Sequence, residues 1–473
     1  MMISSIGTNN IELLLESYRT LEERPIKRLE QQRDSIDKRV SLFSTLKSKL
    51  RKLESLAKEL SYTDSTSIFA SKKATVSDTS YLSVTTDSTA VTTTHTISIS
   101  QLAKADQIVS NQYTLSDTSI YTSLGAGTQT FQVTVNGQSY QISIEIQDND
   151  DNEAILNKIV TAVNNTDDIA ISASVIKDTE TTGRLVFISS ETGSTYKMSL
   201  SDVTGSLLST IGMDDSTEMN GTSGGYVYTS SELDSIITVD GITITRSSNI
   251  IEDAIEGVTL TLKKTHQSGE VPVTLNITNN VENIKSKIQE FIDAYNDVIS
   301  FINTNTKVDS TTYKRSALSG DFAITNLKLQ LRNLISEPVT GLTSGDPNIL
   351  ATIGITTDRE GKLSISDSDT LEDYLESNLD KVAALFNSTD GISSRLVSFL
   401  DDYTDGEGII EKRKDVLQSQ IQFINNRISS LEKTVDRKIE YYRQQFSRLQ
   451  AAYASLSAQF GYMGNIIQSG FIQ

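Results

Sequence analysis

The sequence predicts a multidomain α+β protein, in which a helical coiled-coil leg is built from both chain ends and a β-rich head of two sub-domains is inserted between them. Apolar residues recur at helical spacing near both ends of the chain, and they alternate with polar residues in the middle. The change between the two patterns is abrupt, since 18 of the 35 residues at 61–95 are Ser or Thr. Two apolar helical faces must each be covered, so packing the two ends together is the simplest arrangement.

The N-terminal region is expected to hold a mobile segment, 1–25, with a short helical piece at 9–23, followed by a leg helix within 26–70. Pro25 favours a helix start there, because proline lacks the N–H group that a first helical residue cannot use. The apolar positions that follow lie on one helical face, here called the leg stripe: Leu29, Ile36, Val40, Phe43, Leu46, Leu50, Leu53 and Leu60.

The head is predicted to comprise an inner β domain, 71–105 plus 226–277, and an outer domain, 106–225. Gly224 and Gly225 are interpreted as a hinge between the sub-domains. Charge follows the same division, because residues 106–225 carry 16 acidic and 4 basic side chains.

Local patterns predict the elements of the head. Asn136-Gly137 and Asp240-Gly241 each separate two alternating runs, which is typical of a hairpin closed by a type I′ turn. Residues 152–165 read as a helix, and 171–188 return to strand character.

Helical spacing resumes in a leg domain, 278–408, with helices expected at 281–306 and 321–336 and a further one marked by Leu371 and Val382. A C-terminal coiled-coil helix and tail occupy 409–473. Its apolar positions step by 3 and 4 with one stutter. These positions, here called the seam, are Leu417, Ile421, Ile424, Ile428, Leu431, Val435, Ile439, Tyr442, Phe446, Leu449, Tyr453, Leu456 and Phe460. The seam fits an ordinary intramolecular bundle and a contact with other subunits equally well.

Composition excludes several classes of protein. The net charge of −19 disfavours binding to nucleic acid, because phosphate backbones repel it. The absence of Cys excludes disulfides, zinc-thiolate sites and thiol catalysis, and only 2 His are present. The sequence has no run of 18 apolar residues, so no membrane span is predicted, and no cleavable secretory signal is evident.

The sequence contains no motif that predicts a catalytic, cofactor-binding or metal-binding residue, and the protein is not expected to be an enzyme. The acidic residues Asp148, Asp150, Asp151 and Glu153 could ligate calcium, but they lack EF-hand spacing and fit better a solvated turn before a helix. His95 and His266 lie in strand-like stretches without a nucleophile motif nearby.

A series of segments resembles the flagellar filament-capping proteins, the hook-associated protein 2 family. They are Pro25-Ile26 with LEQQ and FSTLKSKLRKLESL, then QLAKADQ (101–107), VNGQSYQISIEI with GRLVFISSETG (183–193), VDGITITRSSNIIEDAIEGVTLTL (239–262), IGITTDREGKLSI (353–365) and the seam. The resemblance follows this order over nearly the whole length, although the opening MMISSIGTNN departs from it.

The resemblance implies a structural protein that is secreted through the flagellar export channel, with an export chaperone as its partner before secretion. It implies a ring of copies, expected to be a pentamer, at the distal tip of the filament. There it would promote flagellin polymerisation and prevent loss of exported flagellin, with the hook–filament junction protein as another partner. The head would form a plate and the helical legs would reach the growing end. No cofactor is implied.

Two alternatives remain open from the sequence. One is another axial protein of the same appendage, a flagellin or a hook–filament junction protein. The other is a surface adhesin whose β head binds glycans or mucin, although aromatic residues make up only 6% of the chain.

Overall fold

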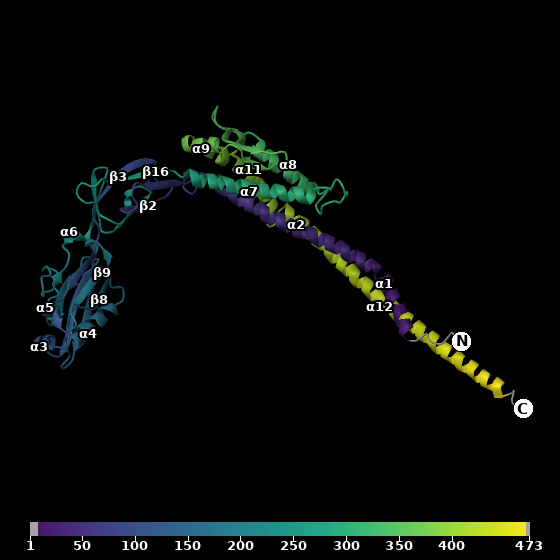
Figure 1. The fold of residues 1–473 in the computed structure, drawn as a ribbon, viewed down its shortest axis with the longest axis horizontal. Helices are drawn as coiled ribbons and strands as arrows, with labels where there is room; N and C mark the ends of the chain where they lie inside the picture. Colours follow the sequence, from purple (N-terminus) through teal and green to yellow (C-terminus); the bar gives the residue numbers. More distant parts are fainter. Residues whose placement is uncertain (1–7, 470–473) are drawn as a thin grey trace. The chain divides into compact units, whose positions relative to one another are not determined.

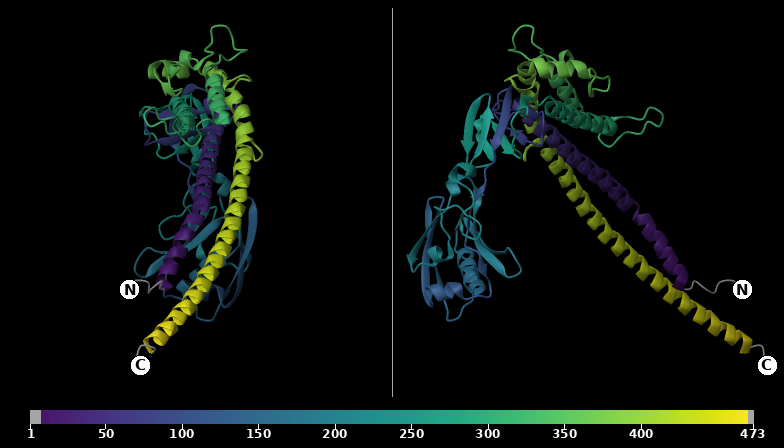
Figure 2. Two further views of the ribbon diagram at one scale, coloured as in Figure 1. Left: turned by 90° about the vertical axis from the view of Figure 1, so that its right-hand side faces the viewer. Right: turned by 60° about the vertical axis from the view of Figure 1, so that its left-hand side comes forward.

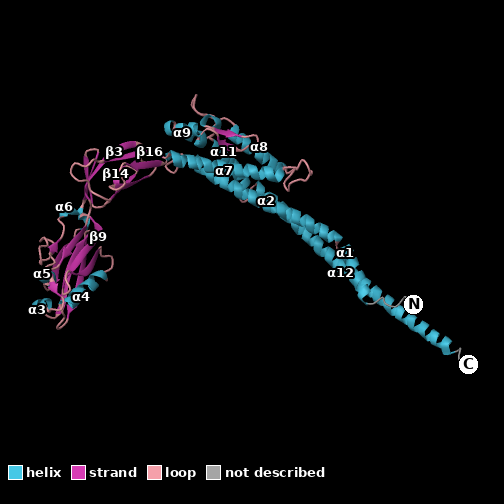
Figure 3. Cartoon of the chain, viewed as in Figure 1, coloured by secondary structure: helices cyan, strands magenta, loops and turns pink. Residues whose placement is uncertain are grey.

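The computed structural model describes residues 8–469, which fold into two compact units (Figures 1 and 3). A helical unit combines the chain up to Thr63 with the residues from Val281 onward. A β-rich unit comprises essentially Ala70–Asn280. The helical unit is therefore built from both parts of the chain that flank the β-rich unit, as the helical spacing predicts. Within residues 8–469, no helix combines the length and the apolar character needed to cross a membrane.

The helical unit has one dominant apolar core, to which all its long helices except α1 contribute buried residues. A short two-stranded sheet, β17 (Ile355–Thr357) with β18 (Leu363–Ile365), packs against α7. The helices are α1 (Thr8–Glu22), α2 (Arg24–Ser61), α7 (Val281–Thr306), α8 (Phe322–Ser336), α9 (Ser368–Ser377), α10 (Leu379–Asn387), α11 (Ile392–Thr404) and α12 (Ile409–Ser469).

The single helix expected around Leu371–Val382 is in fact two helices, α9 and α10. Asn378 lies between them with φ −140° and ψ 39°, outside the helical region, and it occupies the C-cap position of α9 and the N-cap position of α10. Leu371, Leu375, Leu379 and Val382 are still buried in the same core, so the apolar spacing is correct although the continuous helix is wrong.

The β-rich unit contains two separate apolar cores. The first lies between a five-stranded sheet, ordered β1-β16-β3-β12-β13, and a three-stranded sheet, ordered β14-β15-β2. The strands are β1 (Lys72–Val76), β2 (Leu82–Thr86), β3 (Thr93–Gln101), β12 (Ser235–Val239), β13 (Ile242–Arg246), β14 (Ile250–Ile255), β15 (Val258–Leu262) and β16 (Val273–Asn279).

The second core belongs to the outer part of this unit, where α4 packs on β7 and β8. One sheet is ordered β10-β6-β7, and the other is ordered β11-β4-β9-β5 with β8 paired to β9. The elements are β4 (Ala105–Val109), β5 (Tyr113–Thr114), α3 (Ser119–Leu124), β6 (Gly127–Val135), β7 (Gln138–Ile146), α4 (Asn152–Asn164), β8 (Ile171–Lys177), β9 (Thr182–Thr192), β10 (Ser199–Thr204), α5 (Leu207–Ile211), β11 (Gly225–Tyr226) and α6 (Ser230–Leu233).

Both predicted hairpins are confirmed. Asn136 (φ 50°) with Gly137 (φ 71°) joins β6 to β7, and Asp240 (φ 49°) with Gly241 (φ 85°) joins β12 to β13. Positive φ at both central residues is what a type I′ turn requires.

The predicted hinge at Gly224 and Gly225 is wrong. Gly225 pairs with Val109 across β11 and β4. A Cβ atom on Gly224 would lie 2.3 Å from the Gly212 carbonyl oxygen and 2.5 Å from that of Val109. Glycine is needed here because two backbones pass very close to each other.

The acidic cluster forms the start of α4. Asp151 caps the helix by accepting a hydrogen bond from the Ala154 N–H (2.7 Å), and Asp150 pairs with Lys158 at 2.5 Å. No group of three or more acidic or histidine side chains in the described chain is arranged to hold a metal ion. Helix capping accounts for Asp151, and the ion pair with Lys158 accounts for Asp150.

The two histidines make structural hydrogen bonds in the β-rich unit. His95 Nδ1 lies 2.7 Å from Asp240 Oδ2, and His266 Nδ1 accepts from the Ile99 N–H at 3.0 Å. The backbone N–H of Thr96 and the ring of His95 lower the pKa of Asp240 from 3.8 to about 2.

A pH dependence follows from this carboxylate. Because the folded-state pKa is depressed, Asp240 stabilises the fold above its ordinary pKa, and the contribution is lost as pH falls from 3.8 to about 2. Asp240→Asn is expected to lose less stability than the parent chain over this interval, since asparagine also suits the positive φ. Thermal unfolding of the β-rich unit at pH 4.5 and 2.5 measures the difference. Asp167→Asn, at an exposed position, is the control, and equal losses in the two variants would contradict the prediction.

Candidate assembly surface on the helical unit

The leg stripe lies on the buried face of α2. Phe43, Leu46, Leu50, Leu53 and Leu60 are almost completely buried, and Ile36 is buried as well. Leu29 and Val40 are half-buried and pack against the same core. The partners of α2 are α12, α11 and α7, so both parts of the chain that flank the β-rich unit contribute to one helical bundle (Figure 2).

The first part of the seam is covered within the chain. α12 runs beside α2 and then beside α1, and the buried seam residues along this stretch are Leu417, Ile424, Ile428, Val435 and Ile439. Ile421 and Leu431 are half-buried against the same core. This part of the seam therefore has an intramolecular partner.

The covering of the seam continues onto α1. Tyr442 stacks on Tyr18 with ring centroids 5.2 Å apart, and Leu15 is buried. Arg19 pairs with Asp436 at 2.5 Å, and Lys438 pairs with Glu22 at 2.7 Å. Hydrogen bonding to Glu22 raises the pKa of Lys438, which favours the charged form of this lysine.

The expectation of a mobile segment at 1–25 is therefore wrong for residues 8–22, which form α1 and pack on α12. Residues 1–7 lie outside the described chain. The sequence showed the helical character of 9–23 and the length of the C-terminal helix, but not that the two pack on each other.

The last part of the seam is different, because its apolar side chains face solvent. Phe446 is half-buried, whereas Leu449, Tyr453, Leu456 and Phe460 are 61%, 45%, 54% and 61% exposed. These four residues, here called the distal stripe, lie on one face of α12 at spacings of 4, 3 and 4. Contiguous exposed apolar side chains of this kind are typical of interaction surfaces.

Charged contacts fix the covered part of the bundle. Asp321, which caps α8 and is 9% exposed, lies 3.7 Å from Arg39 of α2 and 4.0 Å from Arg413 of α12. Lys47 of α2 binds Glu411 of α12 at 2.8 Å. The hydrogen bond from Lys47 lowers the pKa of Glu411. These pairs join elements distant in sequence, and spacing along the chain could not reveal them.

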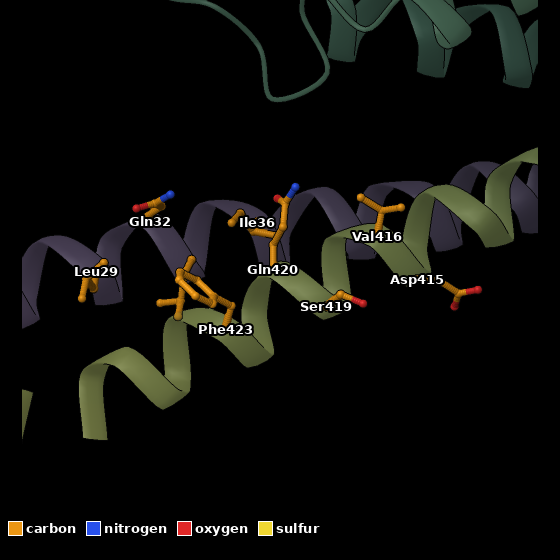
Figure 4. Close-up of a pocket in the computed structure, with 9 residues that line it drawn as sticks. Leu29, Gln32, Ile36, Asp415, Val416, Ser419, Gln420 and Phe423 are labelled. Atoms are coloured by element: carbon orange, nitrogen blue, oxygen red, sulfur yellow. The ribbon is translucent and has the colours of Figure 1, made fainter. Parts of the chain in front are cut away.

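An apolar groove between α2 and α12 was also missed (Figure 4). Leu29 and Ile36 contribute from α2, and Val416, Phe423 and Ile424 contribute from α12. Val416 and Phe423 are 56% and 72% exposed. Val416 and Phe423 each lie one position before a seam residue, and they are seven residues apart. This heptad spacing is a sequence signal for a second apolar stripe beside the seam.

Comparison with known proteins adds independent evidence. Two family models match the chain, "Flagellar hook-associated protein 2 N-terminus" at residues 8–106 and "Flagellar hook-associated protein 2 C-terminus" at 233–458. The chain is 26% identical to the A-type flagellar hook-associated protein 2 of Pseudomonas aeruginosa, with 98% of this chain and 95% of the relative covered. It is 28% identical to flagellar hook-associated protein 2 of Escherichia coli K12, with 98% and 97% covered.

The fold agrees with a solved relative. The crystal structure of the D1-D2-D3 domains of the flagellar cap protein FliD from Escherichia coli superposes with a TM-score of 0.63 at 28% sequence identity, covering 80% of this chain and 99% of that chain. Matching sequence at both ends, full-length relatives and a shared fold lead to one conclusion: the chain belongs to the flagellar hook-associated protein 2 family, the flagellar cap proteins.

Proposed function

We propose that this protein caps the distal tip of the bacterial flagellar filament, where it promotes flagellin polymerisation and prevents loss of exported flagellin. The family membership supports this function. The observation that carries the mechanism is the distal stripe, which leaves the end of α12 exposed beyond the part of the helix that α2 and α1 cover.

In this proposal the distal stripe is covered by neighbouring copies or by the filament end. The cap is a ring, for which we propose five copies, and flagellin is its substrate for assembly. The buried part of the seam holds each leg together, and the exposed part makes a contact that must form and break as the filament grows. Both uses of one helix follow from the change in burial between Ile439 and Leu449.

The remaining assignments are part of the same proposal. The helical unit serves as the leg, and the inner and outer head domains, 71–105 with 226–277 and 106–225, form the plate. The protein is secreted, meets an export chaperone before secretion and adjoins the hook–filament junction protein at an early stage of assembly. It acts without catalysis or a cofactor. Assignment as a flagellin or as a junction protein is not favoured, because both family models are those of hook-associated protein 2.

Deletion of the gene tests the function directly. The expected result is short or absent filaments and flagellin monomer in the medium, with both defects reversed by the full-length gene. Native mass spectrometry of the purified protein tests the number of copies. Normal filaments in the deletion strain would contradict the capping function, whereas a number other than five would contradict only the pentamer.

A further inference from the structure

The outer head domain has a long sheet edge at β7. In the three-stranded sheet β10-β6-β7, β7 pairs with β6 alone, over nine residue pairs without a register shift. Val135 and Gln138 flank the two-residue turn and exchange both backbone hydrogen bonds. Ser139, Gln141, Ser143 and Glu145 therefore direct their N–H and C=O groups away from β6. The hydrogen bond from Lys158 Nζ to the Glu145 carbonyl (3.1 Å) agrees with this direction.

Three consecutive outward-facing residues of this edge are open. Ser139, Gln141 and Ser143 are exposed, and within residues 8–469 no group hydrogen-bonds their main chain on that side. Other edges have side chains that occupy such groups. Asn164 binds both the N–H and the C=O of Ala173 in β8, at 2.8 and 2.9 Å.

The segment 138–144 also lacks the features with which proteins usually protect an edge strand. It contains no lysine, no proline and no bulge. An open, regular edge of this kind can bind another strand through main-chain hydrogen bonds.

The distribution of charge favours the β7 edge of a second copy as the strand that binds here. Residues 106–225 carry 16 acidic and 4 basic side chains, so two outer head domains repel each other over most of their surfaces. The chain has no charged residue from Thr118 to Ile144, and this stretch includes all of β6 and most of β7. The β7 edge is thus a place where a second copy can approach without like-charge repulsion.

We propose that the β7 edges of two copies pair antiparallel about a two-fold axis at Gln141, which joins two three-stranded sheets into one of six strands. This register places Gln141 opposite Gln141 and Ser139 opposite Ser143. Glu145 then lies opposite Gly137, so that no two carboxylates face each other. The same surface patch on both copies satisfies itself, as two-fold symmetry requires. Neighbours in a ring of five copies are not related by a two-fold axis, so this pairing joins copies that belong to different rings or that have not yet entered a ring.

The contact is weak in isolation. Three residue pairs give about six backbone hydrogen bonds over a small area, which is typical of a transient interface. It is separate from the distal stripe, so the two surfaces are tested independently.

Cross-linking tests the pairing, because the chain has no native cysteine. Gln141→Cys in the full chain places two thiols on Cα atoms about 5.5 Å apart in a hydrogen-bonded antiparallel pair, within disulfide range. Gln132→Cys is the matched control, since Gln132 lies directly opposite Gln141 but one strand inside the edge. Under mild oxidation we expect the Gln141→Cys chain to form covalent dimer about tenfold faster than the control chain.

A second substitution checks that the disulfide reports strand pairing. Ser143→Lys, added to Gln141→Cys, is expected to suppress the dimer, because lysine on an edge strand disfavours pairing with another strand and each copy would bring one such charge to the contact. Circular dichroism verifies that each variant is folded. Equal cross-linking at positions 141 and 132, or cross-linking at 141 that Ser143→Lys leaves unchanged, would overturn the proposal.

Discussion

Replacing Leu449, Leu456 and Phe460 together by aspartate is expected to abolish filament growth while leaving the stability of the isolated chain unchanged. These side chains are 61%, 54% and 61% exposed, so the monomer loses little burial when they are replaced. In the assembled cap each would contribute about 1–2 kcal/mol if the exposed part became fully buried. Three carboxylates on the same stripe would remove that contribution and resist desolvation.

A matched variant separates the stripe from the added charge. Ala452, Ser455 and Gln459 lie on the same turns of α12, are exposed, and are off the seam. Their triple replacement by aspartate changes the net charge equally and is expected to preserve filaments. Filament length, swimming and flagellin in the medium are compared in a deletion strain complemented with each variant, and melting temperatures are measured on the purified chains. If the two triple variants gave the same filaments, the distal stripe would not be the contact surface.

Features that depend on nearby residues could be predicted from the sequence. The spacing from Leu417 to Phe460 predicts one long helix, because residues three and four apart share a helical face. Asn136-Gly137 predicts a tight hairpin, because few residue pairs tolerate positive φ at both positions. The same local reasoning places a helix boundary beside Pro25, and α2 begins at Arg24. The boundary is slight, because Glu23 before it still has helical dihedral angles (φ −79°, ψ −12°).

Features that depend on distant residues could not be predicted. Ile428 and Leu456 have the same seam spacing, yet one is buried and the other exposed, because α2 and α1 cover only part of α12. Asp321 has no sequence signal for its contacts with Arg39 and Arg413, which lie hundreds of residues from each other. The Gly-Gly pair at 224–225 suggests a hinge. Only the close approach of the Val109 and Gly212 carbonyl oxygens to Gly224 shows that this position is tightly packed.

The helical unit should also be sensitive to a single deletion of apolar volume in α2. Leu50 is fully buried in its core, so Leu50→Ala is expected to lower the free energy of unfolding of this unit by about 2–5 kcal/mol through lost burial and a cavity. Lys52→Ala, two residues away on the exposed face, should change it by less than about 0.5 kcal/mol.

Hydrogen exchange measured on the full chain under mild urea distinguishes a local from a global effect of this deletion. Amides of α7 and α11, which pack on α2, should exchange faster in Leu50→Ala, because their protection depends on the bundle remaining closed. Amides of β3 and β9 should keep their rates, because the β-rich unit has its own cores. Unchanged exchange in α7 and α11 would show that Leu50 does not hold the bundle together. Faster exchange in β3 and β9 as well would show that the two units unfold as one.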